Sequence, residues 1–267
     1  MMPLRRSASG SGYIKGLPAR ECVSITGELP LNALQSLVPS RFRPAAKRAF
    51  FLGQRIVGLP LTVLHKLLIT PAHLLARRSH QQRKLEIGPG PDRIPGFETL
   101  NVVAASNVDF LWNAAKRLPF RSGTFELVYA SHILEHIPWY ETEQVLAEWV
   151  RIVAPGGRLE IWVPDGLKIC KAFVDAEERA SNDYEKDGWY RFNEQKDPCL
   201  WASGRIFSYG DGVGTLGHPN WHLAVFSYRY LEQALKKAGC RTIEPLERSQ
   251  IRGHDHGWIN LGIAGIK

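Results

Sequence analysis

Short apolar runs separated by turns fill most of the second part of this 267-residue chain. The runs are short and bounded by glycine, proline or polar residues, which is typical of buried strands. They predict five strands and two further strand-like segments, at residues 84–88, 97–103, 108–112, 125–130, 158–163, 242–243 and 258–263.

Two other stretches repeat their apolar residues at the spacing of a helix. The apolar face of residues 145–153 predicts one helix, and Pro155-Gly156-Gly157 is typical of a helix end. Ser227 can cap a second helix, which ends before Gly239. Strands that alternate with helices indicate a layered α/β sheet.

Residues 49–76 are strongly apolar, but Arg55 and Lys66 interrupt the run and Pro60 and Pro71 oppose a continuous helix. The longest charge-free stretches are about ten residues, too short to span a bilayer. We therefore expect two or three helical pieces packed on the rest of the chain. The alternative is that residues 41–78 lie on an anionic membrane surface.

Positive charge is concentrated in the N-terminal part of the chain. Residues 1–84 hold fourteen Lys and Arg but only Glu21 and Glu28, whereas the remainder holds twenty basic and twenty-four acidic residues. The mildly acidic remainder argues against nucleic acid as its substrate, while the basic arm could contact an anionic surface. Residues 1–20 resemble either an organelle transit peptide or a disordered basic tail.

The four cysteines lie far apart and form no Cys-x-x-Cys pair. This spacing argues against a metal cluster and a disulfide framework, and it fits a reducing compartment. We accordingly expect a cytoplasmic protein, with peripheral membrane contact as an addition.

The turn after the first predicted strand is the first candidate for chemistry. Glu86 stands two residues before Gly88, and Gly88-Pro89-Gly90 follows directly. Glycine allows close approach of the backbone to a ligand, and ligands bind at the carboxyl ends of strands in open α/β sheets.

Four further segments follow this turn in the chain, namely Leu118-Pro119-Phe120, residues 125–136, residues 151–157 and Val163-Pro164-Asp165. With them the chain resembles class I S-adenosylmethionine-dependent methyltransferases, in a small bacterial branch akin to the type 11 group. The resemblance covers residues 84–165 well and continues more loosely to residue 267. It implies a Rossmann-like seven-stranded methyltransferase sheet with helices on both faces. The basic N-terminal helical arm over residues 1–83 lies outside the resemblance.

The resemblance also implies a binding site for S-adenosylmethionine. Its glycine turn would hold the methionine part, the segment after the third strand would lie near adenine, and the end of the fourth strand would close the pocket beside the methyl group. The residues implied are Glu86, Gly88, Pro89, Gly90, Asn101, Val103, Asn113, Ala114, Ser131 and His132.

Two positions depart from the family pattern. An acidic residue usually ends the second strand and binds the ribose hydroxyls, but the chain has Val103 there, with Asn101 as the nearest acceptor. Losing these contacts would cost about one to a few kcal/mol, or roughly tenfold in affinity. The link from Pro89 to Gly96 is also too short and proline-rich for a long helix. A degenerate fold acting as a membrane-associated binding or scaffold module is therefore the alternative function.

Other kinds of site fit the residues less well. A dinucleotide site needs a third glycine where the chain has Arg93. His132-Ile133-Leu134-Glu135-His136 matches an inverted zinc-protease pattern, but it follows a strand and precedes Pro138 instead of lying in a long helix. We predict no metal site, expect His136 to pack under the next helix, and interpret His254-Asp255-His256 as an exposed turn.

The acceptor side is expected within an aromatic-rich insertion at about residues 166–226. The insertion is either a small helical unit with its own core or a lid over the acceptor pocket. We predict His222 as the first candidate for a base that deprotonates an acceptor hydroxyl, Asp165 as the second, and His132 as a neighbour of the methyl group. The resemblance suggests a small or glycan-type acceptor methylated at oxygen, and the oligomeric state stays open.

Overall fold

The computed structural model describes residues 58–77, 82–210, 212, 214 and 217–267. The predictions for residues 1–57, including the transit-like segment and the first part of the arm, lie outside the described residues.

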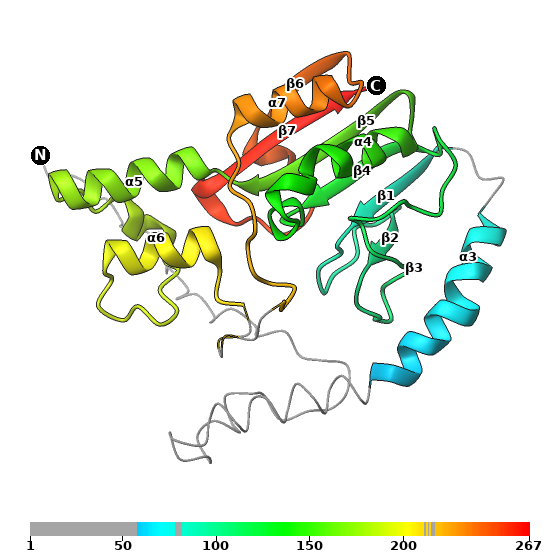
Figure 1. The fold of residues 1–267 in the computed structure, drawn as a ribbon, viewed down its shortest axis with the longest axis horizontal. Helices are drawn as coiled ribbons and strands as arrows, with labels where there is room; N and C mark the ends of the chain where they lie inside the picture. The colour runs from blue at the N-terminus through cyan, green and yellow to red at the C-terminus, as the bar shows by residue number, and fades with distance from the viewer. Residues whose placement is uncertain (1–57, 78–81, 211, 213, 215–216) are drawn as a thin grey trace, which may run out of the picture. The chain divides into compact units, whose positions relative to one another are not determined.

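Seven strands form one mixed sheet in the order β3-β2-β1-β4-β5-β7-β6 (Figure 1). Strands β1 to β5 pair in parallel, and β7 pairs antiparallel with both β5 and β6. The predicted seven-stranded Rossmann-like sheet is confirmed. The bounds are β1 Arg83–Ile87, β2 Glu98–Asn101, β3 Phe110–Leu111, β4 Phe125–Ser131, β5 Val153–Pro164, β6 Thr242–Leu246 and β7 Asn260–Ile266.

Helices α4 (Thr142–Ile152) and α7 (Tyr228–Lys237) pack together and against β5, β6 and β7. The apolar faces of these helices pack against alternate residues of the central strands, and together they form the main core. Ser227 caps α7 as predicted, with Oγ accepting from the N–H of Tyr230. The other face of the sheet has a smaller cluster around Tyr129 and Trp162, covered by loop residues because the β1–β2 link is too short for a helix.

Of the boundaries that differ from the predictions, two change the interpretation. Strand β2 ends at Asn101, two residues earlier than expected. The helix ends at Ile152, and β5 begins at Val153 and continues through Pro155-Gly156-Gly157. A proline can enter a strand at its irregular start, and a register shift between Phe125 and Leu127 accommodates these residues.

The insertion folds into helices α5 (Gly166–Arg179) and α6 (Pro198–Phe207), which pack on each other, with a 3₁₀ turn, η5 (Asp183–Asp187), between them. Its buried cluster is separate from the main core and centres on Trp201 and Tyr184. The insertion therefore has its own core, as one of the two predictions proposed. The remaining 3₁₀ turns are η3 Leu134–His136, η4 Trp139–Glu141, η6 Arg248–Gln250 and η7 Gly257–Ile259.

The segment Gly58–Ala76 forms a continuous helix, long and apolar enough by length and composition to cross a membrane. It contains a π-helical stretch, η2 (His65–Ile69), followed by α3 (Thr70–Ala76). The prediction that prolines divide this segment is wrong, because the wider π turn directly before Pro71 accommodates a residue without an N–H. The prediction that the segment is too short to span a bilayer is not supported by this length.

Asp109 ties the end of this helix to the sheet edge. Its buried carboxylate accepts from Arg77 Nη1 at 2.8 Å and from Arg93 Nη1 at 3.1 Å. It also accepts from the N–H of Thr99 on β2, at 3.1 Å. Burial raises the pKa of this carboxyl, but the bonds and charges of the two arginines outweigh burial and lower the pKa below its usual value.

Candidate functional site

The first of two cavities, the glycine-turn cavity, lies at the carboxyl ends of β1, β2 and β4 and has a volume of about 600 Å³. Seven of the predicted binding residues line it, which confirms that the topology brings these strand ends together. They are Gly88, Pro89, Asn101, Val103, Asn113, Ala114 and His132.

Gly88 is the position in this wall where only glycine fits. Its φ is +72°, and a Cβ atom there would come within 1.9 Å of Ile133 Cδ1. Gly90 is different, because a Cβ there would meet nothing within 4 Å and the residue does not line the cavity. The close-packed turn therefore depends on Gly88 and not on Gly90.

Asn101, the last residue of β2, occupies the position where an acidic residue was expected. The assignment of that position to Val103 is wrong, because the strand ends two residues earlier. Asn101 Oδ1 accepts a hydrogen bond from the N–H of Val102 at 2.7 Å. Asn101 lines the cavity, and this bond holds its side-chain oxygen in place.

The structure places three predicted cofactor residues outside both cavities. Glu86 is buried in β1 and accepts from the N–H of Ile94 at 3.3 Å, and burial raises the pKa of its carboxyl. The carbonyl of Gly90 accepts from Asn107 at 2.8 Å. Ser131 ends β4 without lining either cavity. We conclude that Glu86 supports the turn from behind, since it bonds the β1–β2 link.

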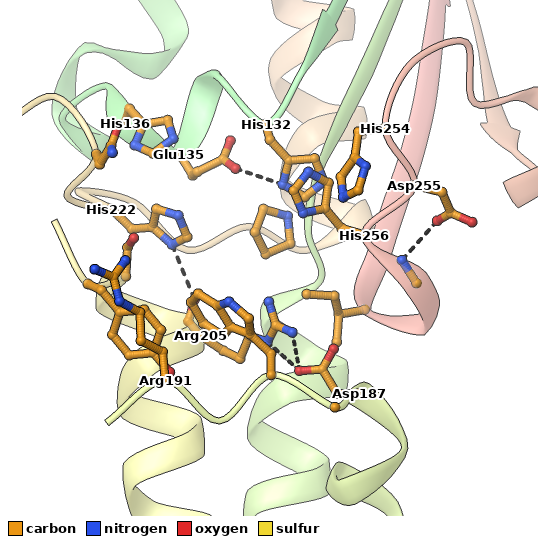
Figure 2. Close-up of a pocket in the computed structure, with 18 of the residues that line it drawn as sticks. His132, Glu135, His136, Asp187, Arg191, Arg205, His222, His254, Asp255 and His256 are labelled. Atoms are coloured by element: carbon orange, nitrogen blue, oxygen red, sulfur yellow. Dashed lines mark hydrogen bonds and ion pairs between the residues drawn. The ribbon is translucent and has the colours of Figure 1, made fainter. Parts of the chain in front are cut away.

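The second cavity, the histidine cavity, has a volume of about 840 Å³ and adjoins the first. The two cavities share three lining residues, namely His132, His136 and Asn220. Walls of the histidine cavity come from the end of β4, the insertion, the segment before α7 and the loop before β7 (Figure 2). A molecule bound here would therefore meet the contents of the glycine-turn cavity at His132 and His136.

His132 is held from both of its ring nitrogens. Nε2 lies 3.0 Å from Asn260 Oδ1, and Nδ1 lies 3.0 Å from Glu135 Oε1. Its φ of +55° is unusual for a residue other than glycine and indicates that the surroundings impose this orientation. Because both ring nitrogens already contact oxygen atoms, His132 has no nitrogen free to act as the base.

Glu135 lies beside His132 and is 1 % exposed. Its carboxylate points toward His132 in Figure 2, and within the described part of the chain Oε2 has no hydrogen-bond partner. Burial raises the pKa of Glu135, but the adjacent His132 outweighs burial and lowers the pKa below its usual value. The carboxylate is therefore a buried negative charge with one oxygen left over.

His136 and His222 face each other with ring centroids 5.0 Å apart. Each uses Nδ1 to contact a backbone carbonyl at 3.2 Å, His136 that of Trp221 and His222 that of Arg205. Since a carbonyl only accepts, Nδ1 carries the proton and Nε2 keeps a free lone pair in each ring. Burial lowers the pKa of His222, which favours its neutral form.

His254, Asp255 and His256 line the same cavity, so the interpretation as a turn without a site role is incomplete. His256 stacks on His132 with ring centroids 3.7 Å apart, and burial lowers its pKa to about 3. Asp255 accepts from Asn260 Nδ2 at 2.9 Å, so Asn260 presents its oxygen to His132. This loop therefore sets the orientation of His132.

Asp165, the second catalytic candidate, lines neither cavity. Its Oδ1 caps α5 by accepting from the N–H groups of Leu167 at 3.0 Å and Lys168 at 3.1 Å. The structure thus gives this carboxylate a helix-capping role, and we do not retain it as catalytic.

The insertion contributes the wall opposite Glu135. Arg205 pairs with Asp187, stacks over Trp189 at 3.9 Å and is largely buried. Trp189 in turn packs against Tyr209 with ring centroids 4.3 Å apart. The insertion therefore has a cavity-lining face in addition to its own core.

Sequence reasoning missed Glu135, Asp187, Arg205 and His256 as site residues. Glu135 stood in the His-x-x-Glu-His pattern and His256 in the His254-Asp255-His256 cluster, and these were the available signals. Asp187 and Arg205 had none, because their neighbours in the cavity are far away in the chain.

The part of the chain that forms the glycine turn also resembles known proteins in sequence. Residues 85–161, from β1 to β5, match the family model described as a methyltransferase domain. This part of the chain is therefore a methyltransferase domain. A search of curated proteins finds no match to the chain.

Solved structures similar to this methyltransferase are remote. One is a SAM-dependent methyltransferase from Thermotoga maritima, described as a possible histamine N-methyltransferase. The two sequences are 18% identical, the match covers 83% of this chain and 97% of that chain, and the TM-score is 0.40. Another, from Archaeoglobus fulgidus, has 16% identity, coverage of 73% and 92%, and a TM-score of 0.39. Similarity at this level carries no argument about the acceptor.

The cofactor of the methyltransferase is S-adenosylmethionine, and the glycine-turn cavity fits it. The volume lies in the range of pockets for ligands of this size. The cofactor has no phosphate, so the turn needs no helix N-terminus to bind one. The backbone at Gly88 and the side chains of Asn101 and Asn113 are the groups placed to hold it.

Proposed function

We propose that this enzyme methylates an oxygen atom of a small or glycan-type acceptor bound in the histidine cavity. The observation that carries the proposal is the pair of adjoining cavities, which share His132, His136 and Asn220. S-adenosylmethionine supplies an electrophilic methyl group, and the protein must align the acceptor with it and exclude water.

An oxygen acceptor is supported by the histidines around the shared wall. A hydroxyl must lose a proton as it is methylated, and this loss is assisted by a nitrogen with a free lone pair. His222 Nε2 is such an atom, because Nδ1 contacts the carbonyl of Arg205. We therefore retain His222 as the residue that acts on the acceptor oxygen, with His132 as a fixed neighbour of the methyl group.

A glycan-type acceptor is supported by the insertion wall. Trp189 and Tyr209 offer apolar ring surface, while Asp187 and Arg191 offer polar groups beside it. A sugar ring presents both apolar C–H and hydroxyl groups, which suits a cavity of mixed character.

The test is production of S-adenosylhomocysteine from S-adenosylmethionine with a panel of sugars, sugar acids and other hydroxyl compounds. We expect turnover with at least one oxygen acceptor, and at least a 100-fold loss in His222→Ala while cofactor affinity stays within about twofold. Turnover only with amines or thiols would contradict oxygen specificity. Turnover undiminished in His222→Ala would remove that residue from the mechanism.

A peripheral contact of residues 41–78 with anionic membranes at the cytoplasmic face is a separate proposal. It is supported by exposed leucines on the Gly58–Ala76 helix, including Leu67 and Leu68, at 68% and 63% exposure. Vesicles that contain phosphatidylserine should co-sediment more of the wild type than vesicles without it, and the Leu67→Glu, Leu68→Glu double variant should lose binding. Equal sedimentation of both proteins would exclude the contact. The comparisons do not support the alternative of a degenerate scaffold module.

A further inference from the structure

Three residues in the histidine cavity converge as metal ligands do. Glu135, His136 and His222 each offer one ligand atom, and these atoms all lie within 4.8 Å of one another. Two ligands of one zinc ion, at about 2.0–2.1 Å from it, lie roughly 3.3 Å apart in tetrahedral geometry. A small side-chain rotation would therefore close the three residues around one ion.

Each of these three side chains is held by one atom and leaves another without a partner. His136 and His222 contact backbone carbonyls through Nδ1, so each directs an unprotonated Nε2 elsewhere. Glu135 lies against His132 through Oε1, while Oε2 is buried without a hydrogen-bond partner among the described residues. Metal-binding histidines and carboxylates are oriented in this way by outer partners.

The buried Oε2 of Glu135 is the observation independent of the clustering itself. A buried carboxylate oxygen without a partner is costly, and each such atom calls for an explanation. In Figure 2, Glu135, His136 and His222 lie next to one another in the cavity. A divalent cation between them would satisfy the carboxylate and use both free lone pairs at once.

We propose that Glu135, His136 and His222 bind one divalent transition-metal ion, of the class of Zn²⁺, Co²⁺, Mn²⁺ or Fe²⁺. Two imidazoles and one carboxylate suit these ions better than Ca²⁺ or Mg²⁺, which take oxygen ligands. Three protein ligands leave coordination positions open for a further molecule. The site differs from the His-x-x-Glu-His pattern, because His222 takes the place of His132, which orients Glu135 instead.

The site rests on the proposed function and specifies how His222 acts. Because His136 lines both cavities, an ion bound there lies at their junction, where the acceptor oxygen must be. The ion would hold the hydroxyl oxygen and lower its pKa, so that the O–H bond breaks with its electron pair left on oxygen and the proton passing to water. His222 would then act on the acceptor through the ion.

The test is calorimetric titration of chelator-treated full-length protein with Zn²⁺, repeated with Co²⁺ while its visible absorption is recorded. We expect one ion per chain, and at least a 100-fold weaker affinity in Glu135→Gln and in His222→Ala. Glu178→Gln changes an exposed carboxylate on α5 that lines neither cavity, and it should change affinity less than about twofold. Bound Co²⁺ should show the absorption of nitrogen and oxygen ligands.

S-adenosylhomocysteine binding by each variant separates the two proposals. If the variants bind S-adenosylhomocysteine within about twofold of the wild-type affinity but no longer bind Zn²⁺, the variants are folded and the metal site is supported. If wild-type protein binds no stoichiometric Zn²⁺, or both variants bind it as tightly as wild type, the metal site is overturned while the methyltransferase activity stands. If wild-type protein binds Zn²⁺ but no S-adenosylhomocysteine, the proposed function fails and the metal site remains.

Discussion

The glycine-turn cavity and the histidine cavity adjoin each other but are assembled in different ways. Most walls of the first come from successive strand ends between Gly88 and Ile137, whereas those of the second come from four segments between His132 and Ile259. The first depends on backbone geometry, since Gly88 has φ of +72°. The second depends on side chains that orient one another, as Asp255, Asn260 and His132 do. If the proposed function is correct, the fold makes the site of the common cofactor, and side chains make the site of the individual acceptor.

The largest expected effect tests whether the backbone turn makes the first cavity. Gly88→Asp should weaken S-adenosylhomocysteine binding by at least 100-fold, because a Cβ there collides with Ile133 and the φ is strained. Gly90→Ala is the matched control and should change affinity less than about twofold, since its Cβ has open space. Calorimetry on both variants measures this. Tight binding by Gly88→Asp would break the contrast.

The second prediction concerns the sheet edge that supports the first cavity. Asp109→Asn should destabilise the protein by about 2–3 kcal/mol, because it removes the buried partner of Arg77 and Arg93. Denaturant unfolding measures the loss. Asp175→Asn breaks the more exposed pair with Arg179 and should leave the midpoint unchanged.

The pH dependence of this effect has a defined sign. The folded pKa of Asp109 is lowered, so its stabilisation is fully present above the unfolded value of about 3.9 and is lost as the pH falls through the folded value. The difference between wild type and Asp109→Asn should therefore shrink in acid. A difference that grows below pH 4 would contradict the ion-pair account.

A third change sharpens the account of how the first cavity binds ribose. Asn101→Asp should tighten S-adenosylhomocysteine binding by up to about tenfold, because a carboxylate can accept from ribose hydroxyls while keeping its bond from the Val102 N–H. Calorimetry of the two proteins decides the matter. Weaker binding in the aspartate variant would mean that the Asn101 amide donates to the cofactor.

The smallest expected effect separates Asp165 from the acceptor side. Asp165→Ala should cost about 1 kcal/mol through loss of the α5 cap, and Asp165→Ser should restore most of it. Thermal unfolding measures both variants. Equal destabilisation by alanine and serine would show that capping is not the role of this side chain.

These differences explain what could be predicted from the sequence. The apolar runs and the Gly88 turn predicted the sheet and most of the first cavity, because neighbouring strand ends meet in a parallel sheet. The error at Val103 came from a strand boundary, since Val102 and Val103 continue the apolar pattern beyond the last ladder residue. Glu135 and Arg205 could not be paired with their neighbours, because only tertiary packing brings residues 135, 205 and 256 into one cavity.

We propose that the glycine-turn cavity binds the cofactor and the histidine cavity binds the acceptor of one methyltransferase site. The decisive measurement is a crystal structure with S-adenosylhomocysteine. The ligand should lie along Gly88 and Asn101, with its sulfur directed to the wall shared at His132 and His136. A ligand bound elsewhere, or a sulfur pointing away from the histidine cavity, would show that the two cavities do not form one site.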